Sequence, residues 1–141
     1  MKIRVQKLNQ NAKMPKYALD GDAGMDIFST ESKTLAVGEK HIFGTGIAIK
    51  VPDGHVGLVW DKGGVGQKFG VKTLGGVLDS NYTGEMFVAL VNLGSEPFVV
   101  DRGQKIAQML FQHVEKAEVE EVEIMPETVR REGRHGSTGR F

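Results

Sequence analysis

The stretch FGTGIAIKVPDGHVGLVW, residues 43–60, decides the fold class of this chain. From Phe43 to Val51, β-branched or aromatic side chains occupy every second position, and the same period returns from Val56 to Trp60. Successive side chains of a β-strand point to opposite faces of a sheet, so a period of two indicates strands. The residues PDG at 52–54 separate the two runs and favour a turn. The stretch therefore predicts two short strands.

Similar runs continue on both sides of this stretch, at residues 2–8, 86–93 and 106–114. The run at 86–93 is apolar on both faces, which is typical of a central strand. No segment shows a 3.6-residue period with capping residues, and no repeat or linker divides the chain. We expect an all-β, jelly-roll-like β-barrel. It should occupy residues 1–127, and residues 128–141, which lack core periodicity, should form a flexible C-terminal arm.

Composition excludes several classes of protein. The 141 residues contain no cysteine, so disulfides, thiolate metal sites and cysteine nucleophiles are excluded. The N-terminal residues lack a signal-like apolar core, and no segment is long enough to span a membrane, so we expect a cytoplasmic protein without membrane contact. Lys plus Arg equals Asp plus Glu at 18 each, which argues against a nucleic-acid partner. Residues 115–127 are acidic, whereas the last dozen residues are rich in arginine.

The segment DKGGVGQKFGV, residues 61–71, is the most unusual in composition. Its glycines and lysines suit a loop whose backbone N–H groups wrap an anion, although a flexible turn has the same composition. The spacing of a P-loop is absent. The spacing of the dinucleotide fingerprint is missed by one residue, and no helix is expected after the loop.

The next segment, TLGGVLDSNYTGE at residues 73–85, predicts a β-hairpin with Asp79 and Tyr82 near its tip. An aspartate in a turn commonly makes local hydrogen bonds, so Asp79 taken alone is more often structural than catalytic.

Two further polar residues lie within apolar runs. Asp26 lies in AGMDIFS and Gln108 in DRGQKIAQM, and each needs a partner if it is buried. A structural role is the simpler interpretation of either residue alone. The four histidines are scattered without metal-ligand spacing, and no serine occupies a nucleophile elbow.

Taken in order, these segments resemble the five motifs of the trimeric dUTPase family. AGMDIFS resembles the first motif, and DKGGVGQKFG resembles the second, P-R-S-G-x-x-x-K-x-G. GGVLDSNYTGE is similar to the third, G-V-I-D-x-D-Y-x-G-E, and GQKIAQM to the fourth, G-x-R-x-A-Q. Residues 130–139 resemble the fifth, R-G-x-G-G-F-G-S-T-G. Each motif is weak alone, but five in order with sensible gaps are specific.

The resemblance implies a jelly-roll subunit, a homotrimer with active sites shared between subunits, and hydrolysis of dUTP to dUMP and pyrophosphate. That reaction limits uracil in DNA and supplies dUMP for dTMP synthesis. The implied cofactor is Mg²⁺, held mainly by the triphosphate and water rather than by protein ligands. A water attacks the α-phosphorus, and Asp79 would orient and activate it. Asp26 would support the neighbourhood of Asp79, and Gln108 would contact a phosphate.

The remaining roles implied by the resemblance concern substrate binding. Tyr82 would pack under the deoxyribose and leave no room for a 2′-hydroxyl. The backbone around Gly76, Val77 and Phe87 would read the uracil edge. On the phosphate chain and in the arm, the implied substrate contacts are Lys62, Gly63, Gly64, Arg130 at the γ-phosphate, His135 over the base, Gly136 and Ser137.

The chain departs from the family pattern at several positions. Gly63 stands where the family has serine, so a hydroxyl on the phosphate chain is missing, and Lys62 replaces an arginine that binds phosphate through two donors. Asn81 replaces the second aspartate of the third motif. In the fifth motif His135 replaces phenylalanine, and two arginines, Arg131 and Arg134, replace glycines.

Two alternatives stay open at this level. One is a deaminase of the same fold acting on dCTP, which would need a carboxylate beside the pyrimidine amino group. The other is a catalytically weakened nucleotide-binding homologue, an interpretation supported by Gly63.

Overall fold

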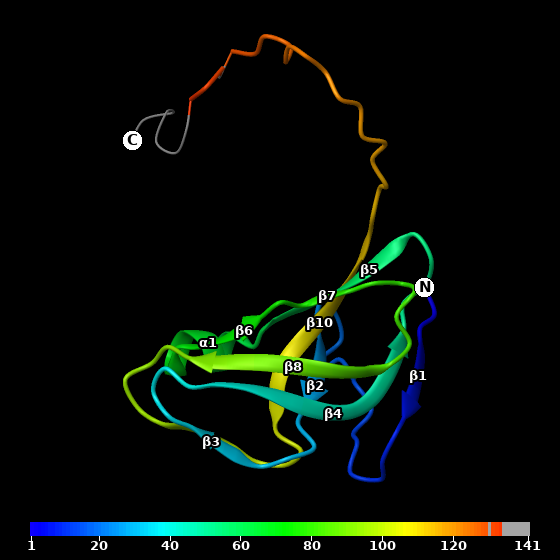
Figure 1. Cartoon of the computed structure of the whole chain (residues 1–141). Helices are drawn as coiled ribbons and strands as arrows, with labels where there is room; N and C mark the ends of the chain where they lie inside the picture. The colour runs from blue at the N-terminus through cyan, green and yellow to red at the C-terminus, as the bar shows by residue number, and fades with distance from the viewer. Residues whose placement is uncertain (130, 134–141) are drawn as a thin grey trace.

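The computed structural model describes residues 1–129 and 131–133 of the chain. Within these residues the strands that were predicted are present, each with slightly different bounds (Figure 1). The elements are β1 (Arg4–Lys7), β2 (Met25–Phe28), β3 (Lys33–Leu35), β4 (Lys40–Lys50), β5 (His55–Asp61), α1 (Gly63–Phe69), β6 (Val71–Leu74), β7 (Val77–Leu78), β8 (Glu85–Asn92), β9 (Phe98–Val100) and β10 (Lys105–His113).

The strands form two four-stranded sheets with the orders β1-β4-β8-β6 and β2-β10-β5-β7, and β3 pairs with β9 in a two-stranded ribbon. All the pairings within these sheets are antiparallel. The all-β, jelly-roll-like prediction is therefore confirmed. Each four-stranded sheet keeps two edge strands in the described chain, so the body consists of two facing sheets rather than one continuously paired barrel.

The core lies between the two sheets and explains the alternation seen in the sequence. On β4 the side chains of Phe43, Thr45, Ile47 and Ile49 are buried at 1% exposure or less. They pack with side chains from β8 and β10 such as Met109. Burial of this apolar surface supplies the main driving force for folding, at roughly 25 cal/mol per Å². The period of two in the sequence thus reflects which side chains of each strand face the opposite sheet.

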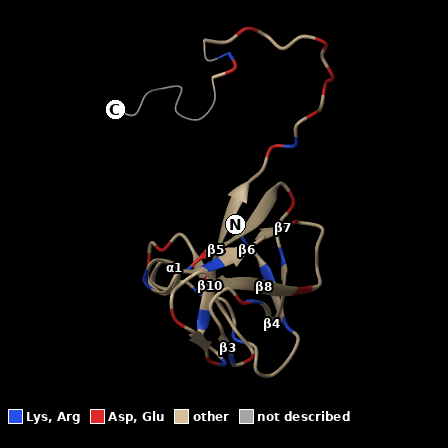
Figure 2. Ribbon diagram, turned by 60° about the vertical axis from the view of Figure 1, so that its left-hand side comes forward, with Lys and Arg blue, Asp and Glu red and all other residues tan. Residues whose placement is uncertain are grey.

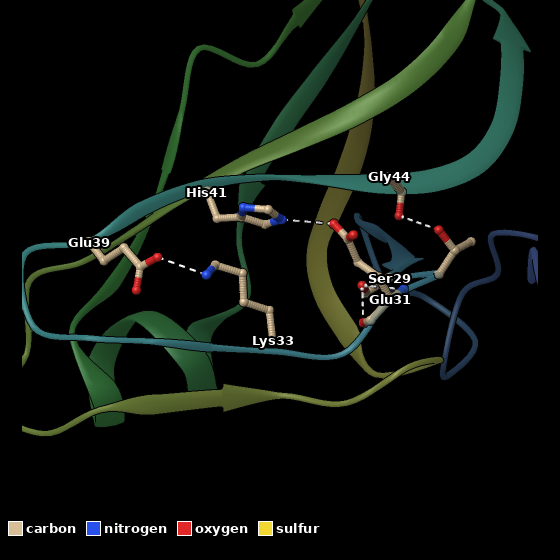
Figure 3. Close-up of polar contacts among 7 residues, drawn as sticks. Ser29, Glu31, Lys33, Glu39, His41 and Gly44 are labelled. Carbon is tan, nitrogen blue, oxygen red and sulfur yellow. Dashed lines mark hydrogen bonds and ion pairs between the residues drawn. The ribbon is translucent and has the colours of Figure 1, made fainter.

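A row of polar contacts holds the chain between β2 and β4 (Figure 3). Lys33 Nζ lies 2.8 Å from Glu39 Oε1, and His41 Nε2 lies 2.9 Å from Glu31 Oε1. The hydrogen bond from Lys33 and that from the Ala36 N–H lower the pKa of Glu39. Ser29 Oγ donates to the Glu31 carbonyl at 2.7 Å. These contacts fix the β3–β9 ribbon against the edge of β4.

One expectation about the glycine-rich segment is wrong. Residues 63–69 form the short helix α1 rather than an irregular loop. No side chain of α1 is buried, which explains why no helical period is visible in the sequence. The helix ends at Gly70, which adopts the left-handed conformation with φ of 70° and donates its N–H to the Gly66 carbonyl. The glycines therefore begin and end a helical turn.

The chain beyond β10 leaves the sheets. The last strand ends at His113, and residues 114–129 run away from the body with exposed side chains (Figure 1). Acidic side chains recur along this segment (Figure 2). The domain boundary predicted after residue 127 stays a prediction. In the structure the extended segment begins earlier, at Val114. In the part of the chain that the structure describes, no helix is long and apolar enough to cross a membrane.

Candidate functional site

The connection that carries Asp79 differs from the predicted hairpin. β7 pairs with β5 in one sheet, whereas β8 pairs with β4 and β6 in the other. Residues 79–84 therefore cross between the sheets, and the hairpin prediction is wrong because β7 and β8 are not paired with each other. The crossing leaves a pocket of about 270 Å³ between the two strands. It is lined by Val59, Gly76, Val77, Leu78, Asp79, Tyr82, Glu85, Met86 and Phe87.

The backbone of β7 offers free polar groups at this pocket. The Val59 N–H donates to the Gly76 carbonyl at 2.7 Å. Antiparallel pairing alternates, so the backbone groups of the next residue, Val77, face away from β5 and toward the open edge. Gly76 has φ of +111°, and a Cβ there would lie 2.6 Å from the Val59 carbonyl oxygen. A side chain at position 76 would consequently disrupt this edge.

Tyr82 forms one wall of the pocket. Its hydroxyl donates to the Glu85 carbonyl at 2.8 Å, which fixes the ring across the base of the turn. A Cβ at position 84 would lie 2.6 Å from that hydroxyl, so Gly84 provides the space that the ring occupies. The Glu85 carboxylate is directed away from the pocket, because its Oε1 accepts the Gly46 N–H at 2.8 Å.

Asp79 is exposed at the mouth of the pocket. Its side chain has no hydrogen bond or ion pair with any residue of the described chain, while its carbonyl accepts the Tyr82 N–H at 3.2 Å. The turn thus fixes the backbone and leaves the carboxylate free to bind water.

A second polar cluster surrounds Asp26 on β2. The carboxylate is 1% exposed and lies between two ammonium groups, Lys62 Nζ at 2.6 Å from Oδ1 and Lys105 Nζ at 2.6 Å from Oδ2. The Lys105 contact is an ion pair whose direction does not meet hydrogen-bond geometry, so Oδ2 lacks a hydrogen-bond donor within the described residues. Burial raises the pKa of Asp26, but its contacts with Lys105 and Lys62 outweigh burial and the net pKa is lowered.

Gln108 joins this cluster to the start of α1. Its Nε2 donates to the Asp61 carbonyl at 2.8 Å. The Asp61 side chain in turn accepts both the N–H and the hydroxyl of Thr73 through Oδ1, at 2.7 and 2.6 Å, and pairs with Lys72 through Oδ2 at 2.9 Å. Asp61 therefore fixes the chain just before α1, and its carbonyl orients the Gln108 amide.

The first turn of α1 follows directly. The N–H groups of Gly63 and Gly64 have no acceptor within the described residues. A Cβ added at either position would meet open space. The cluster thus combines two lysine cations with two free backbone donors and the Gln108 amide, all of which can contact anionic oxygens.

The pocket and this cluster do not meet within one chain. Gln108 lies opposite Trp60, whereas Leu78, the residue before Asp79, lies opposite Gly57 on the other side of β5. Three register positions and two strand spacings separate Gln108 from Leu78 by about 14 Å. Asp26 is one strand farther away. The expected support of Asp79 by Asp26 is therefore not made within a single chain, where Asp26 contacts Lys62 and Lys105.

Four predicted residues, Arg130, His135, Gly136 and Ser137, lie outside the described residues. Conversely, sequence reasoning missed Val59, Glu85 and Met86 at the pocket and Lys105 beside Asp26. The pocket residues belong to apolar strand patterns that give no sign of a ligand. Lys105 could have been found, because it occupies the basic position of GQKIAQ.

No three histidine, aspartate or glutamate side chains of the described chain converge to form a metal site.

The comparisons with known proteins agree with this geometry. A family model described as dUTPase matches residues 10–139. Deoxyuridine 5'-triphosphate nucleotidohydrolases of Clostridium novyi and Clostridium tetani are 43% and 39% identical. The alignments cover 99% of both chains for the first, and 98% of this chain and 97% of the relative for the second.

Solved structures show the same fold. A mutant dUTPase of phage 80alpha has a TM-score of 0.90 at 26% identity, covering 96% of this chain and 98% of that one. A second, a Staphylococcus bacteriophage 80alpha dUTPase with dUpNHpp, has a TM-score of 0.88 at 27% identity and covers 98% of both chains. A dUTPase from phage phi11 of S. aureus, described with a structural Mg(II) ion, has a TM-score of 0.81 at 26% identity, covering 88% of this chain and 98% of that one.

Two open-edged sheets with a small pocket at their crossing define the chain as an all-β protein with a pocket between sheet edges. The match over most of its length establishes that it belongs to the dUTPase family.

Proposed function

We propose that this protein hydrolyses dUTP to dUMP and pyrophosphate, acting on the cytoplasmic nucleotide pool. The observation that carries the proposal is the pocket itself. Five residues assigned to uracil, deoxyribose and water, namely Gly76, Val77, Asp79, Tyr82 and Phe87, line one cavity of about 270 Å³. Gly76 and Val77 lie at β7 of one sheet, and Phe87 lies in β8 of the other. Asp79 and Tyr82 lie in the turn that crosses between the two sheets.

Recognition of uracil would use the open edge of β7. A uracil edge carries alternating acceptors and a donor, and the Val77 N–H and carbonyl face the pocket without a partner strand. A cytosine edge would leave buried polar groups mismatched, which costs about 1–3 kcal/mol for each group. Tyr82, fixed by its hydrogen bond to the Glu85 carbonyl, would pack under the deoxyribose and exclude a 2′-hydroxyl.

The chemical step would use Asp79 as the group that orients a water and accepts its proton. The carboxylate is exposed at the pocket mouth and has no cation within the described residues to neutralise it. The water would attack the α-phosphorus, the bond from that phosphorus to the bridging oxygen would break, and pyrophosphate would leave. Such chemistry depends on positioning and charge neutralisation more than on covalent help.

Phosphate contacts would come from the cluster around Asp26. Lys62 and the N–H groups of Gly63 and Gly64 would meet phosphate oxygens, and Gln108 would donate from its amide. The described residues contain no three-carboxylate site, so we propose that Mg²⁺ takes its ligands from the triphosphate and water. When bound, the ion would offset the charge of the phosphates.

We further propose a homotrimer whose sites are shared between subunits. The water on the α-phosphorus and the Gln108 amide on a phosphate would both have to reach the same short triphosphate chain. Within one chain Asp79 and Gln108 are more than about 10 Å apart by strand register, which supports a site completed by a second copy. Exposed apolar side chains at the pocket, Val77 at 69% and Phe87 at 53%, offer surface for that copy.

The activity is tested by measuring pyrophosphate and ammonia release from dUTP, dCTP, dTTP and UTP, with Mg²⁺ and with EDTA. We expect pyrophosphate from dUTP alone, dependent on Mg²⁺. Ammonia from dCTP would instead identify a deaminase. Nucleotide binding without either product would identify a binding protein.

Subunit sharing is tested by mixing two inactive variants, Asp79→Asn and Gln108→Ala, after unfolding and refolding them together. If one site takes Asp79 and Gln108 from different subunits, random mixing at equal amounts restores about one quarter of wild-type activity. A site contained within one chain gives no recovery, because every subunit then carries one of the two changes. Each variant refolded alone is the control.

A further inference from the structure

The turn that carries Asp79 has few contacts that fix its position. Within residues 79–84, the Tyr82 N–H donates to the Asp79 carbonyl, and the Tyr82 hydroxyl donates to the Glu85 carbonyl. Both bonds connect the turn to itself or to the first residue of β8. Neither fixes the turn relative to the remainder of the sheets, although the carboxylate of Asp79 must be placed to within fractions of an ångström for catalysis.

Lys50 supplies such a contact from another strand. It is the last residue of β4, and its ammonium group donates to the carbonyl of Ser80, the residue after Asp79. In the part of the chain that the structure describes, no other side chain from outside residues 79–85 hydrogen-bonds to this turn. The same ammonium group lies 3.1 Å from Asp53 Oδ1 in the β4–β5 turn.

The base of this contact is rigid. Lys50 is paired with Arg4 of β1, and its neighbours in sequence, Ile49 and Val51, are 1% and 0% exposed. The Cα of Lys50 is therefore fixed by the core, and its side chain transmits that position to the turn. A cation that donates to a carbonyl makes a stronger bond than a neutral donor does.

From this geometry we propose that Lys50 is a positioning residue that fixes the Asp79 turn for water activation. The inference rests on the proposed function, because it assigns the water to Asp79. It also predicts a particular kinetic signature. The Tyr82 hydroxyl is held by the Glu85 carbonyl at the start of β8, and Val77 lies in β7, so the nucleoside-binding contacts depend on Lys50 less than the position of Asp79 does. Loss of Lys50 should therefore lower kcat and leave KM nearly unchanged.

The experiment compares four variants with the wild-type oligomer by dUTP kinetics and by amide hydrogen exchange. Lys50→Met keeps the aliphatic stem and removes the donor, and we expect kcat to fall about tenfold with KM changed less than about twofold. The Tyr82 amide, which donates to the Asp79 carbonyl, should exchange faster. Lys50→Arg should restore most of kcat, because the guanidinium can still donate to the Ser80 carbonyl.

Two controls separate this role from general effects of charge. Lys40→Met removes a lysine from the other end of β4. The Lys40 side chain makes no hydrogen bond or ion pair within the described chain, so kcat should stay unchanged. Asp53→Asn removes the charge of the second partner of Lys50. The Asp53 side chain is 93% exposed, so this change should also leave kcat unchanged.

The inference is overturned if Lys50→Met keeps wild-type kcat, if KM rises in proportion to the loss, or if either control loses as much activity. It is also overturned if arginine at position 50 gives no recovery. An inactive wild-type protein would instead contradict the proposed function. In that case hydrogen exchange alone decides, and unchanged exchange of the Tyr82 amide in Lys50→Met would refute the positioning role.

Discussion

At the scale of single residues, two aspartates with the same chemistry are given different tasks by their surroundings. Asp26 is buried between two lysines, and those cations lower its pKa, so it stays ionised and fixed. Asp79 is exposed without an ionic partner in the described chain. A general base needs access to water and freedom from a permanent cation, and Asp79 meets both conditions. These environments fit Asp26 to a structural role and support the proposal that Asp79 is the catalytic carboxylate.

Replacing Asp79 by asparagine should abolish turnover while leaving nucleotide binding largely intact. The amide can still occupy the position but cannot accept the proton of the attacking water. Steady-state kinetics and titration with a non-hydrolysable dUTP analogue measure the two effects separately. A loss in kcat/KM smaller than about tenfold, ~1.4 kcal/mol, would contradict the assignment.

Introducing serine at position 63 should raise kcat. A Cβ at this position meets no atom within 4 Å, so the hydroxyl can be added without displacing neighbours. A hydrogen bond to a charged phosphate is worth ~1.5–3 kcal/mol if it forms mainly in the transition state. The comparison is kcat for Gly63→Ser and Gly63→Ala. Equal activities of these two variants would show that any gain comes from the helix rather than from the hydroxyl.

At the scale of elements, the connection from β5 through α1 to β6 is positioned by Asp61. Its side chain binds both polar groups of Thr73 on β6, and its carbonyl orients Gln108 on β10. α1 buries no side chain completely, but Val65 packs against the core and the Phe69 ring lies 5.3 Å from the Phe98 ring. The N–H groups of Gly63 and Gly64, which we propose bind phosphate, are consequently placed by the polar contacts of Asp61 together with the packing of Val65 and Phe69.

This arrangement predicts acid sensitivity. Burial raises the pKa of Asp61, but hydrogen bonds from Thr73 and the contact with Lys72 outweigh it, and the net pKa is lowered. A lowered folded-state pKa gives stability that is present above the unfolded value and is lost as pH falls through the folded one. Asp61→Asn should therefore reduce the free energy of unfolding by about 1–2 kcal/mol at pH 7, and the difference should shrink below about pH 4.

Urea unfolding of the wild-type protein and of Asp61→Asn between pH 3 and pH 7 checks this prediction. Asp53→Asn, a change at an exposed carboxylate, is the control. A difference between wild type and Asp61→Asn that is the same at every pH would mean that shape rather than charge makes the contribution.

At the scale of the whole molecule, the segment after β10 extends away from the two sheets (Figure 1). Residues 114–129 extend beyond β10, and apolar side chains among them are solvent-exposed, such as Val119 at 93% and Ile124 at 84%. These exposed apolar side chains offer surface to the second copy that we propose completes the site. The separation of the pocket from the Asp26 cluster leads to the same expectation.

Deleting residues 129–141 should leave a folded trimer with little activity. The sheets end at His113, so the core does not depend on these residues. The deleted segment carries Arg130, Arg131 and Arg134, whose charges can neutralise a triphosphate, and His135, which can stack on uracil. Cleavage by trypsin after these arginines should be fast in the free protein and slowed by a dUTP analogue with Mg²⁺. Full activity of the truncated protein would refute the role of the arm.

The sequence by itself determined the fold class, the main strands and the family. The alternation at residues 43–51 gives a strand two faces of unequal polarity. Such a strand can be assigned to a sheet before the strands that pair with it are known. The order of the five motifs identified the family, because each motif is a local pattern. Gly76 and Asp79 were assigned on that basis without any contact being known.

Tertiary structure alone decided which strands pair and which residues meet. The segment around Asp79 has the local pattern of a hairpin, yet β7 pairs with β5 in one sheet and β8 pairs with β4 and β6 in the other. The contacts of Asp26 with Lys105 and of Lys50 with Ser80 join residues 79 and 30 positions apart. No local pattern encodes such pairs, since they depend on how the core brings distant strands together.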